Sequence, residues 1–182
     1  MKFRGHLKTV SLHRKLVRQY CFRAGLYRQG LLHDLSKYSP TEFFPGVKYY
    51  SGKLSPHSGE RKDKGYSAAW LHHKGRNKHH PEYWMDYGPN GGSYTGGKMP
   101  VKYVVEMFCD RLAACRVYHG ADYKPSDAYD YFVKSRERCP FHPETAELLE
   151  TLLVKAMNEG EEEAFRYIRE ELLKSPERND LK

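Results

Sequence analysis

The chain has 182 residues, a formal net charge of +8, 39% hydrophobic residues and 30% charged residues. This length fits one domain with its own apolar core, and the composition argues against a disordered chain. No apolar run approaches the roughly 20 residues that a membrane-spanning helix needs, so we expect no membrane association. The four cysteines are isolated, which argues against a zinc ribbon and favours reduced thiols in the cytoplasm.

The charge excess is confined to one part of the sequence. Residues 1–40 contain nine Lys and Arg against a single acid, Asp34, whereas the remainder is balanced at 22 and 22. A positive surface there would attract a small phosphorylated substrate such as a nucleotide. Binding of nucleic acid is a weaker alternative. The simplest alternative is a solvent-exposed basic surface that binds no partner.

The first predicted helix covers residues 11–24, where Val17, Tyr20 and Ala24 form an apolar stripe with His13 on the same face. A second helix is predicted over residues 27–37. Its apolar positions are leucines, and His33 and Asp34 lie between them.

The middle of the chain alternates helices with loops. Ser39-Pro40-Thr41-Glu42 has the form of a capping box, and Pro45-Gly46 is expected to end that turn. Residues 45–60 are loop-like, a helix is predicted over 60–74, and 81–86 resembles a short helix. The glycine-rich segment 88–98 is a candidate lid.

The strongest predicted helix covers residues 100–118 and carries Asp110 near its middle. Three further helices are predicted at 127–138, 143–158 and 161–174, and the last two form a helical hairpin for packing or for a homodimer face. No segment is a convincing strand. We therefore predict an all-α fold in a single domain, 1–182, with a site in 10–120 and packing helices in 121–182.

The candidate site consists of charged or imidazole side chains set within apolar segments. A carboxylate in an apolar stretch is costly unless it is paired or bound to metal. His13, His33-Asp34 and Asp110 follow the order H … HD … D, and this pattern resembles the HD-domain superfamily of metal-dependent phosphohydrolases. The HDLSK string from His33 to Lys37 looks like the HD-x-x-K variants of that superfamily.

The resemblance implies an HD-like helical bundle that binds one or two divalent ions, with Mn, Fe, Mg, Zn and Co as candidates. His13, His33, Asp34 and Asp110 would hold the metal, and Asp34 would also orient a metal-activated water that attacks phosphorus. Lys37 lies one helical turn further and would neutralise a phosphate oxygen. The ordinary alternative for Lys37 is a solvated helix lysine.

A histidine-rich block lies between His33-Asp34 and Asp110 and contains His72, His73, His79 and His80. Members of the superfamily with two metals, including cyclic-dinucleotide phosphodiesterases and myo-inositol oxygenase, take additional histidine ligands from this interval. The G-Y-P string of those phosphodiesterases is absent here. We favour His73 and His80 as ligands, with His72 and His79 as neighbours or alternatives, against a surface loop that binds nothing.

Two residues inside that block are candidates for substrate binding. Arg76 could make a bidentate phosphate contact and Asn77 could hydrogen-bond the substrate, although Gly-Arg-Asn is also ordinary turn chemistry. Strings such as LLHDLSKYSPTEF and VVEMFCDRLAA also look like a family of uncharacterised bacterial and phage-type proteins. The competing functions are a di-iron oxygenase resembling myo-inositol oxygenase, a non-catalytic module that binds nucleic acid or a protein partner, and a scaffold with a structural metal only.

Overall fold

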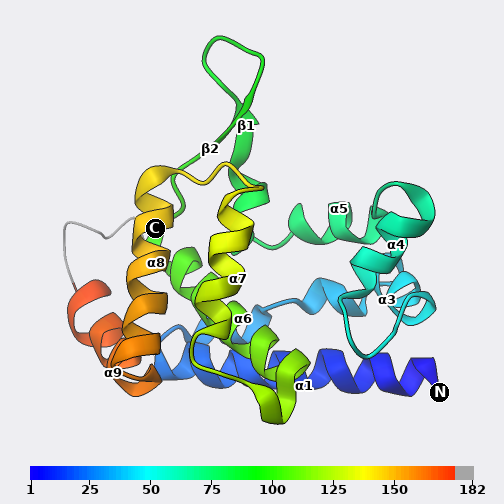
Figure 1. Cartoon of the computed structure of the whole chain (residues 1–182), viewed down its shortest axis with the longest axis horizontal. Coiled ribbons are helices and arrows are strands. Elements are labelled where there is room, and N and C mark those ends of the chain that lie inside the picture. The colour runs from blue at the N-terminus through cyan, green and yellow to red at the C-terminus, as the bar shows by residue number, and fades with distance from the viewer. Residues whose placement is uncertain (175–182) are drawn as a thin grey trace.

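The structure is a computed structural model that describes residues 1–174. Helix α1 runs along one side of the molecule and α6 packs on it (Figure 1). Helices α3, α4 and α5 gather near the N-terminal end of α1, and α7, α8 and α9 lie toward its other end (Figure 1). The elements are α1 (Lys2–Arg23), α2 (Tyr27–Leu32), η1 (Leu35–Tyr38), α3 (Pro40–Lys48), α4 (Pro56–Lys64), α5 (Ala68–Lys74), η2 (Pro81–Trp84), β1 (Met85–Tyr87), β2 (Tyr94–Gly96), α6 (Val101–His119), η3 (Gly120–Asp122), α7 (Asp127–Arg136), α8 (Pro143–Asn158), α9 (Glu161–Tyr167) and η4 (Ile168–Leu172).

Helix α1 begins nine residues before the predicted start at residue 11. The reason is that its buried stripe continues backward with helical spacing through Val10 to His6, and both of these residues are buried. Gly46 of α3 allows His6 to approach, because a Cβ at that glycine would lie only 2.3 Å from His6 Nε2. The long α1 therefore carries His13 into the interior between α3 and α6.

The predicted continuous helix over residues 27–37 is wrong. Helix α2 ends at Leu32, Asp34 adopts a left-handed backbone conformation with φ of 53°, and the 3₁₀ turn η1 follows. Arg14 of α1 stabilises the break, because its Nε donates to the carbonyl of His33 at 2.8 Å. The leucines that suggested one apolar helix face are about half exposed, at 55% for Leu31 and 48% for Leu35.

Three other predicted boundaries are also wrong. Helix α3 continues through Pro45-Gly46 to Lys48, so the predicted loop 45–60 contains the end of α3 and the beginning of α4. The predicted helix 60–74 is two helices, because Gly65 is left-handed at φ 80° and Ser67 caps α5 by accepting a hydrogen bond from the Trp70 amide.

The segment 85–96 forms a two-stranded antiparallel hairpin that sequence periodicity did not reveal. Tyr87 and Tyr94 pair across it, with stacked rings 5.1 Å apart. Gly96 allows the base of the hairpin to pack closely against Pro140, because a Cβ at this position would lie 2.1 Å from the Pro140 carbonyl oxygen. The hairpin projects away from the helices (Figure 1), and none of its residues lines the cavity described below.

The second half of the described chain follows the prediction closely, and the all-α class is confirmed. Helices α6, α7, α8 and α9 lie where the apolar periodicity placed them, and η4 continues α9. No helix within residues 1–174 has the length and apolar character needed to cross a bilayer. The main core is apolar and fully buried, and it includes Val17, Val104, Phe108, Leu112, Phe132, Leu149, Leu152, Phe165 and Ile168.

Candidate metal centre

Four residues from three segments meet at the centre of the molecule. His13 comes from α1, Asp110 from α6, and His33-Asp34 from the break after α2. His13 Nε2 lies 3.0 Å from Asp110 Oδ1 and 3.5 Å from Asp34 Oδ2. His33 Nε2 lies 3.3 Å from Asp34 Oδ2 and 3.4 Å from Asp110 Oδ1. Two imidazoles and two carboxylates thus offer one ligand atom each around a common point.

A second cluster forms on the other side of the Asp34 carboxylate. His73 Nε2 lies 3.3 Å and His79 Nε2 lies 3.6 Å from Asp34 Oδ1, and His80 belongs to the same group. Asp34 therefore directs Oδ2 toward one cluster and Oδ1 toward the other. This is the arrangement of a carboxylate that can bridge two cations.

The backbone of Asp34 explains how it reaches both clusters. A left-handed conformation is uncommon outside glycine, although aspartate tolerates it better than most residues, and such strain concentrates at functional sites. The Asp34 side chain is fully buried. Had α2 continued without interruption, residues 33 and 34 would have pointed about 100° apart.

Several inner atoms of the two clusters make no hydrogen bond. Within the described chain these buried atoms are Nε2 of His13, His33, His79 and His80 and Oδ1 of Asp34, although Nε2 of His13, His33 and His79 lies 3.0–3.6 Å from the carboxylates of Asp34 and Asp110. Buried polar atoms are nearly always satisfied, so unpaired atoms at one place indicate a missing partner. Imidazole nitrogens and carboxylate oxygens share the capacity to donate a lone pair to a metal ion. The residues present therefore fit a divalent metal.

Two further glutamates orient the imidazoles from outside. Glu106 Oε1 lies 2.9 Å from His33 Nδ1 and 3.1 Å from His79 Nδ1. Glu42 contacts His73 Nδ1 through Oε2 at 2.8 Å. A carboxylate that holds the outer nitrogen of a histidine directs the inner nitrogen toward a metal. This carboxylate–histidine arrangement occurs three times around the centre.

The charges of the cluster are strongly coupled. Burial raises the pKa of the Asp34 carboxyl, but His33 and Lys37 lower it, and the net result is a pKa well below the usual range. The pKa of Asp110 is lowered in the same way by His13 and His33 against its burial. Burial lowers the pKa of His33, yet Asp34 and its other acidic neighbours raise it well above the usual value. Without a metal, a proton on His33 therefore balances part of the buried negative charge.

The remaining predicted site residues occupy different positions. Lys37 contacts the centre, with Nζ 2.5 Å from Asp34 Oδ2. Asn77 donates to Ser36 Oγ and to the carbonyl of His73, both at 2.8 Å, so its amide links the η1 turn to the histidine-rich block. His72 turns outward and binds Glu42 Oε1 at 2.7 Å, outside the inner cluster. Arg76 is exposed and does not line the cavity.

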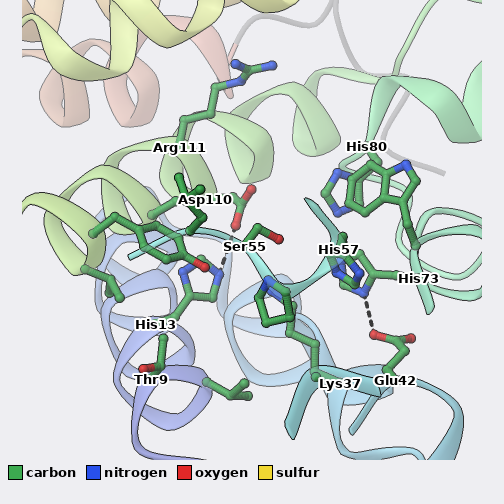
Figure 2. A pocket seen from close by; sticks show the side chains of 18 of the residues that line it. Thr9, His13, Lys37, Glu42, Ser55, His57, His73, His80, Asp110 and Arg111 are labelled. Carbon is green, nitrogen blue, oxygen red and sulfur yellow. Dashed lines mark hydrogen bonds and ion pairs between the residues drawn. The ribbon is translucent and has the colours of Figure 1, made fainter. Parts of the chain in front are cut away.

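A cavity of about 260 Å³ opens onto the centre. Figure 2 shows His13 and Asp110 on one side of it and His73 and His80 on the other, with Lys37 between them. His57 also lines the cavity, and burial followed by the charge of His73 lowers its pKa to about 3, so its ring is neutral. An open side on a group of potential ligands is typical of a catalytic site rather than a closed structural one.

The sequence reasoning missed three residues of this site. Glu42 was interpreted only as part of a capping box, and His57 lay in a predicted loop. Glu106 had a usable signal, because it precedes Asp110 by four residues and so shares its helix face. Its near-complete burial, with 6% exposed, requires the partners that His33 and His79 provide.

Comparison with known proteins gives a family and no activity. The model of a family of unknown function, DUF5662, matches residues 2–155, and the chain belongs to that family. No curated protein and no solved structure matches the chain.

Proposed function

We propose that this member of the DUF5662 family is an HD-type, metal-dependent phosphohydrolase that acts on a small phosphoester. The observation that carries the proposal is the buried Asp34 carboxylate, which presents one oxygen to each of two clusters of potential ligand atoms. Two cations sharing one carboxylate are typical of phosphoryl-transfer sites. The order of the ligands along the chain, H … HD … H … H … D, supports the HD assignment.

The donor set favours a borderline transition metal. His13, His33 and Asp110 would hold one ion and His73, His79 and His80 the other, with Asp34 between them. A mixture of imidazole and carboxylate suits Mn, Fe, Co or Zn better than Ca, which prefers oxygen alone. The inner carboxylates together with Glu42 and Glu106 would balance the charge of two divalent ions.

The bound metal would activate a water as the nucleophile and polarise the phosphoryl oxygens. The chain's own contribution is orientation and charge. Asp34 is held by Lys37 at 2.5 Å and would fix the position of that water. Lys37 lines the cavity and would offset negative charge that develops on the phosphoryl group. The buried setting strengthens each of these electrostatic contacts.

A dinuclear iron oxygenase is the second candidate, because the same ordered ligand set occurs in myo-inositol oxygenase. The specific observation that favours it is the number of histidines, which exceeds what a magnesium-type phosphatase site needs. Oxygen consumption by the iron-loaded protein separates the two functions. A purely structural metal is disfavoured by the cavity that reaches the centre.

The test is to load the metal-free protein separately with Mn, Fe, Co and Zn and to assay p-nitrophenyl phosphate and bis-p-nitrophenyl phosphate. We expect hydrolysis with at least one metal and a loss of about 1,000-fold in Asp110→Asn. Asp63→Asn, an exposed carboxylate on α4, is the matched control and should keep full activity. Metal-loaded protein that hydrolyses no phosphoester but consumes oxygen would replace the proposal with the oxygenase.

A further inference from the structure

We propose that Arg111 is a substrate-recognition residue that binds a carboxylate at the other end of the substrate, at the α7 side of the cavity. The inference rests on the proposed function and assigns its substrate class, a compact phosphoester with two acidic ends. Arg111 follows the potential ligand Asp110 directly in the chain and lines the same cavity.

Within residues 1–174, Arg111 is a buried cation with no carboxylate at ion-pair distance. Its residue is only 7% exposed, and the carboxylates of Asp110 and Glu82 act on its guanidinium only from a longer range. Its Nε is buried and has no hydrogen-bond partner. Buried arginines are normally paired, because an uncompensated buried charge is costly. An anionic ligand would supply the absent partner.

The surroundings of Arg111 hold its guanidinium at one place without neutralising it. Nη1 donates to Ser135 Oγ at 3.2 Å, and Nη2 lies 3.9 Å from Met107 Sδ. The guanidinium carbon lies 5.1 Å from the centre of the Tyr131 ring and 5.7 Å from that of Phe132. A planar guanidinium fixed against aromatic rings is preorganised for bidentate contact with a carboxylate or phosphate.

The helix geometry places the metal centre at Asp110 and the anion-binding group of Arg111 on different sides of the cavity. Successive residues of a helix point about 100° apart, so Asp110 faces the histidines while Arg111 turns toward α7. Figure 2 shows the Arg111 side chain extending away from Asp110, His13 and Lys37. A phosphoryl group at the metal centre and an acidic group at Arg111 would therefore belong to opposite ends of one molecule.

The cavity limits the size of that molecule. Its volume of about 260 Å³ lies just below the range of roughly 300–1,000 Å³ that is usual for small-molecule sites. This favours a compact phosphoester over a nucleoside triphosphate. Lys37 is already engaged by Asp34, so Arg111 is the cation that is free to select the distal group.

Glu82 is the competing explanation. Its carboxylate lines the same cavity and acts on Arg111 from beyond ion-pair distance. If a small movement paired the two residues, Arg111 would need no ligand. The Glu82→Gln variant separates the possibilities through its melting temperature. An unchanged melting temperature supports an Arg111 that awaits a ligand, whereas a lower one would show that Glu82 is its internal partner and would overturn the subsite.

The experiment uses phosphorylated carboxylates of two to four carbons, each matched with the analogue in which an alcohol replaces the carboxylate, for example 3-phosphoglycerate with glycerol 3-phosphate. Calorimetric binding and turnover are both measured on the metal-loaded full chain. We expect at least one carboxylate of the series to bind tenfold or more tightly than its analogue. Arg111→Met should abolish that preference and leave the affinity for the alcohol analogue unchanged, and Arg111→Lys should restore part of the preference.

Arg18→Met, an exposed arginine on α1, is the matched control and should keep the preference. Binding preference without turnover would overturn the hydrolase proposal and retain the Arg111 subsite. Turnover with no carboxylate preference anywhere in the series, or a preference that survives in folded Arg111→Met, would overturn the subsite and retain the hydrolase. If Arg111→Met has a lower melting temperature, Arg111→Lys decides, and a preference as large as that of the wild type would overturn the subsite.

Discussion

Side chains are buried both in the core around α7–α9 and at the centre between α1, α5 and α6. The two regions differ in the contacts that these buried side chains make. In the first region Leu149, Leu152 and Phe165 are fully buried and pack against one another, so that region is complete without a ligand. In the second, most of the imidazoles and carboxylates are also buried, and within the described residues several of their inner atoms make no hydrogen bond. On our proposal, burial on the α7–α9 side serves stability, whereas burial at the centre serves the binding of a cation.

The largest effect is expected from Asp34→Asn. Asparagine keeps the volume and tolerates the left-handed backbone, but it removes the negative charge that both clusters share. We expect phosphoesterase activity to fall about 1,000-fold, equivalent to roughly 4 kcal/mol of barrier. Steady-state assays with p-nitrophenyl phosphate measure the change, and more than a tenth of the wild-type activity would contradict the shared role of Asp34.

Metal removal should destabilise the centre and therefore the whole fold. A ligand present at about 1,000 times its dissociation constant stabilises the folded state by roughly 4 kcal/mol, which amounts to about 10 °C for a chain of this size. We expect a chelator to lower the melting temperature by about that amount in the wild type and by little in Asp34→Asn. Equal melting curves with and without chelator would show that no cation stabilises the wild type.

The apolar region should respond to the opposite kind of change. Leu152 is fully buried in α8, so Leu152→Ala should lower the free energy of unfolding by about 2–5 kcal/mol. The ratio of bound metal to folded protein should not change, because no ligand atom moves. Urea denaturation and metal analysis of the same sample measure both quantities. A proportional loss of metal from folded protein would mean that the two regions are not separate.

Removing an outer carboxylate should have a smaller effect. Glu106→Gln or Glu42→Gln leaves every ligand atom in place but weakens the orientation of the imidazoles, and we expect a 10- to 100-fold loss of metal affinity. Glu60→Gln is the matched control, since Glu60 is a buried carboxylate that binds Ser67 Oγ at 2.7 Å, outside both clusters. Competition with a chromophoric chelator gives the affinities, and equal losses in all three variants would attribute the effect to burial alone.

The smallest effect concerns pH. The pKa of His33 is raised well above its usual value in the metal-free protein, so its imidazole is protonated at neutral pH and a cation must displace that proton. Metal affinity should therefore increase with pH, by about tenfold per unit for one displaced proton, until the pH passes the folded-state pKa of His33. Calorimetry in two buffers of different ionisation enthalpy measures the released protons. Release of none would contradict the protonated state of His33.

The sequence predicts the second half of the fold better than the first half. Residues 101–172 contain long helices whose apolar spacing is strong, and their positions follow from periodicity. The break at His33-Asp34 could not be predicted, because it depends on a hydrogen bond from Arg14, which lies 19 residues away in the chain. Leu31 and Leu35 have the spacing of a buried helix face, but both side chains are about half exposed in the folded chain.

Residue types and their order along the chain indicated His13, His33, Asp34 and Asp110, and the structure brings these four side chains together. The histidine-rich block was ambiguous, because sequence spacing does not distinguish the inward His73, His79 and His80 from the outward His72. The folded chain makes that distinction, because Nε2 of His73 and His79 faces the Asp34 carboxylate whereas Nδ1 of His72 contacts Glu42.

The most direct test of the central claim is to count and locate divalent ions in the full chain after metal loading, by elemental analysis and anomalous X-ray scattering. The account predicts two ions per chain, on either side of the Asp34 carboxylate, one beside His13 and Asp110 and the other beside His73 and His79. A chain that takes up no metal, or that binds it away from Asp34, would contradict the account.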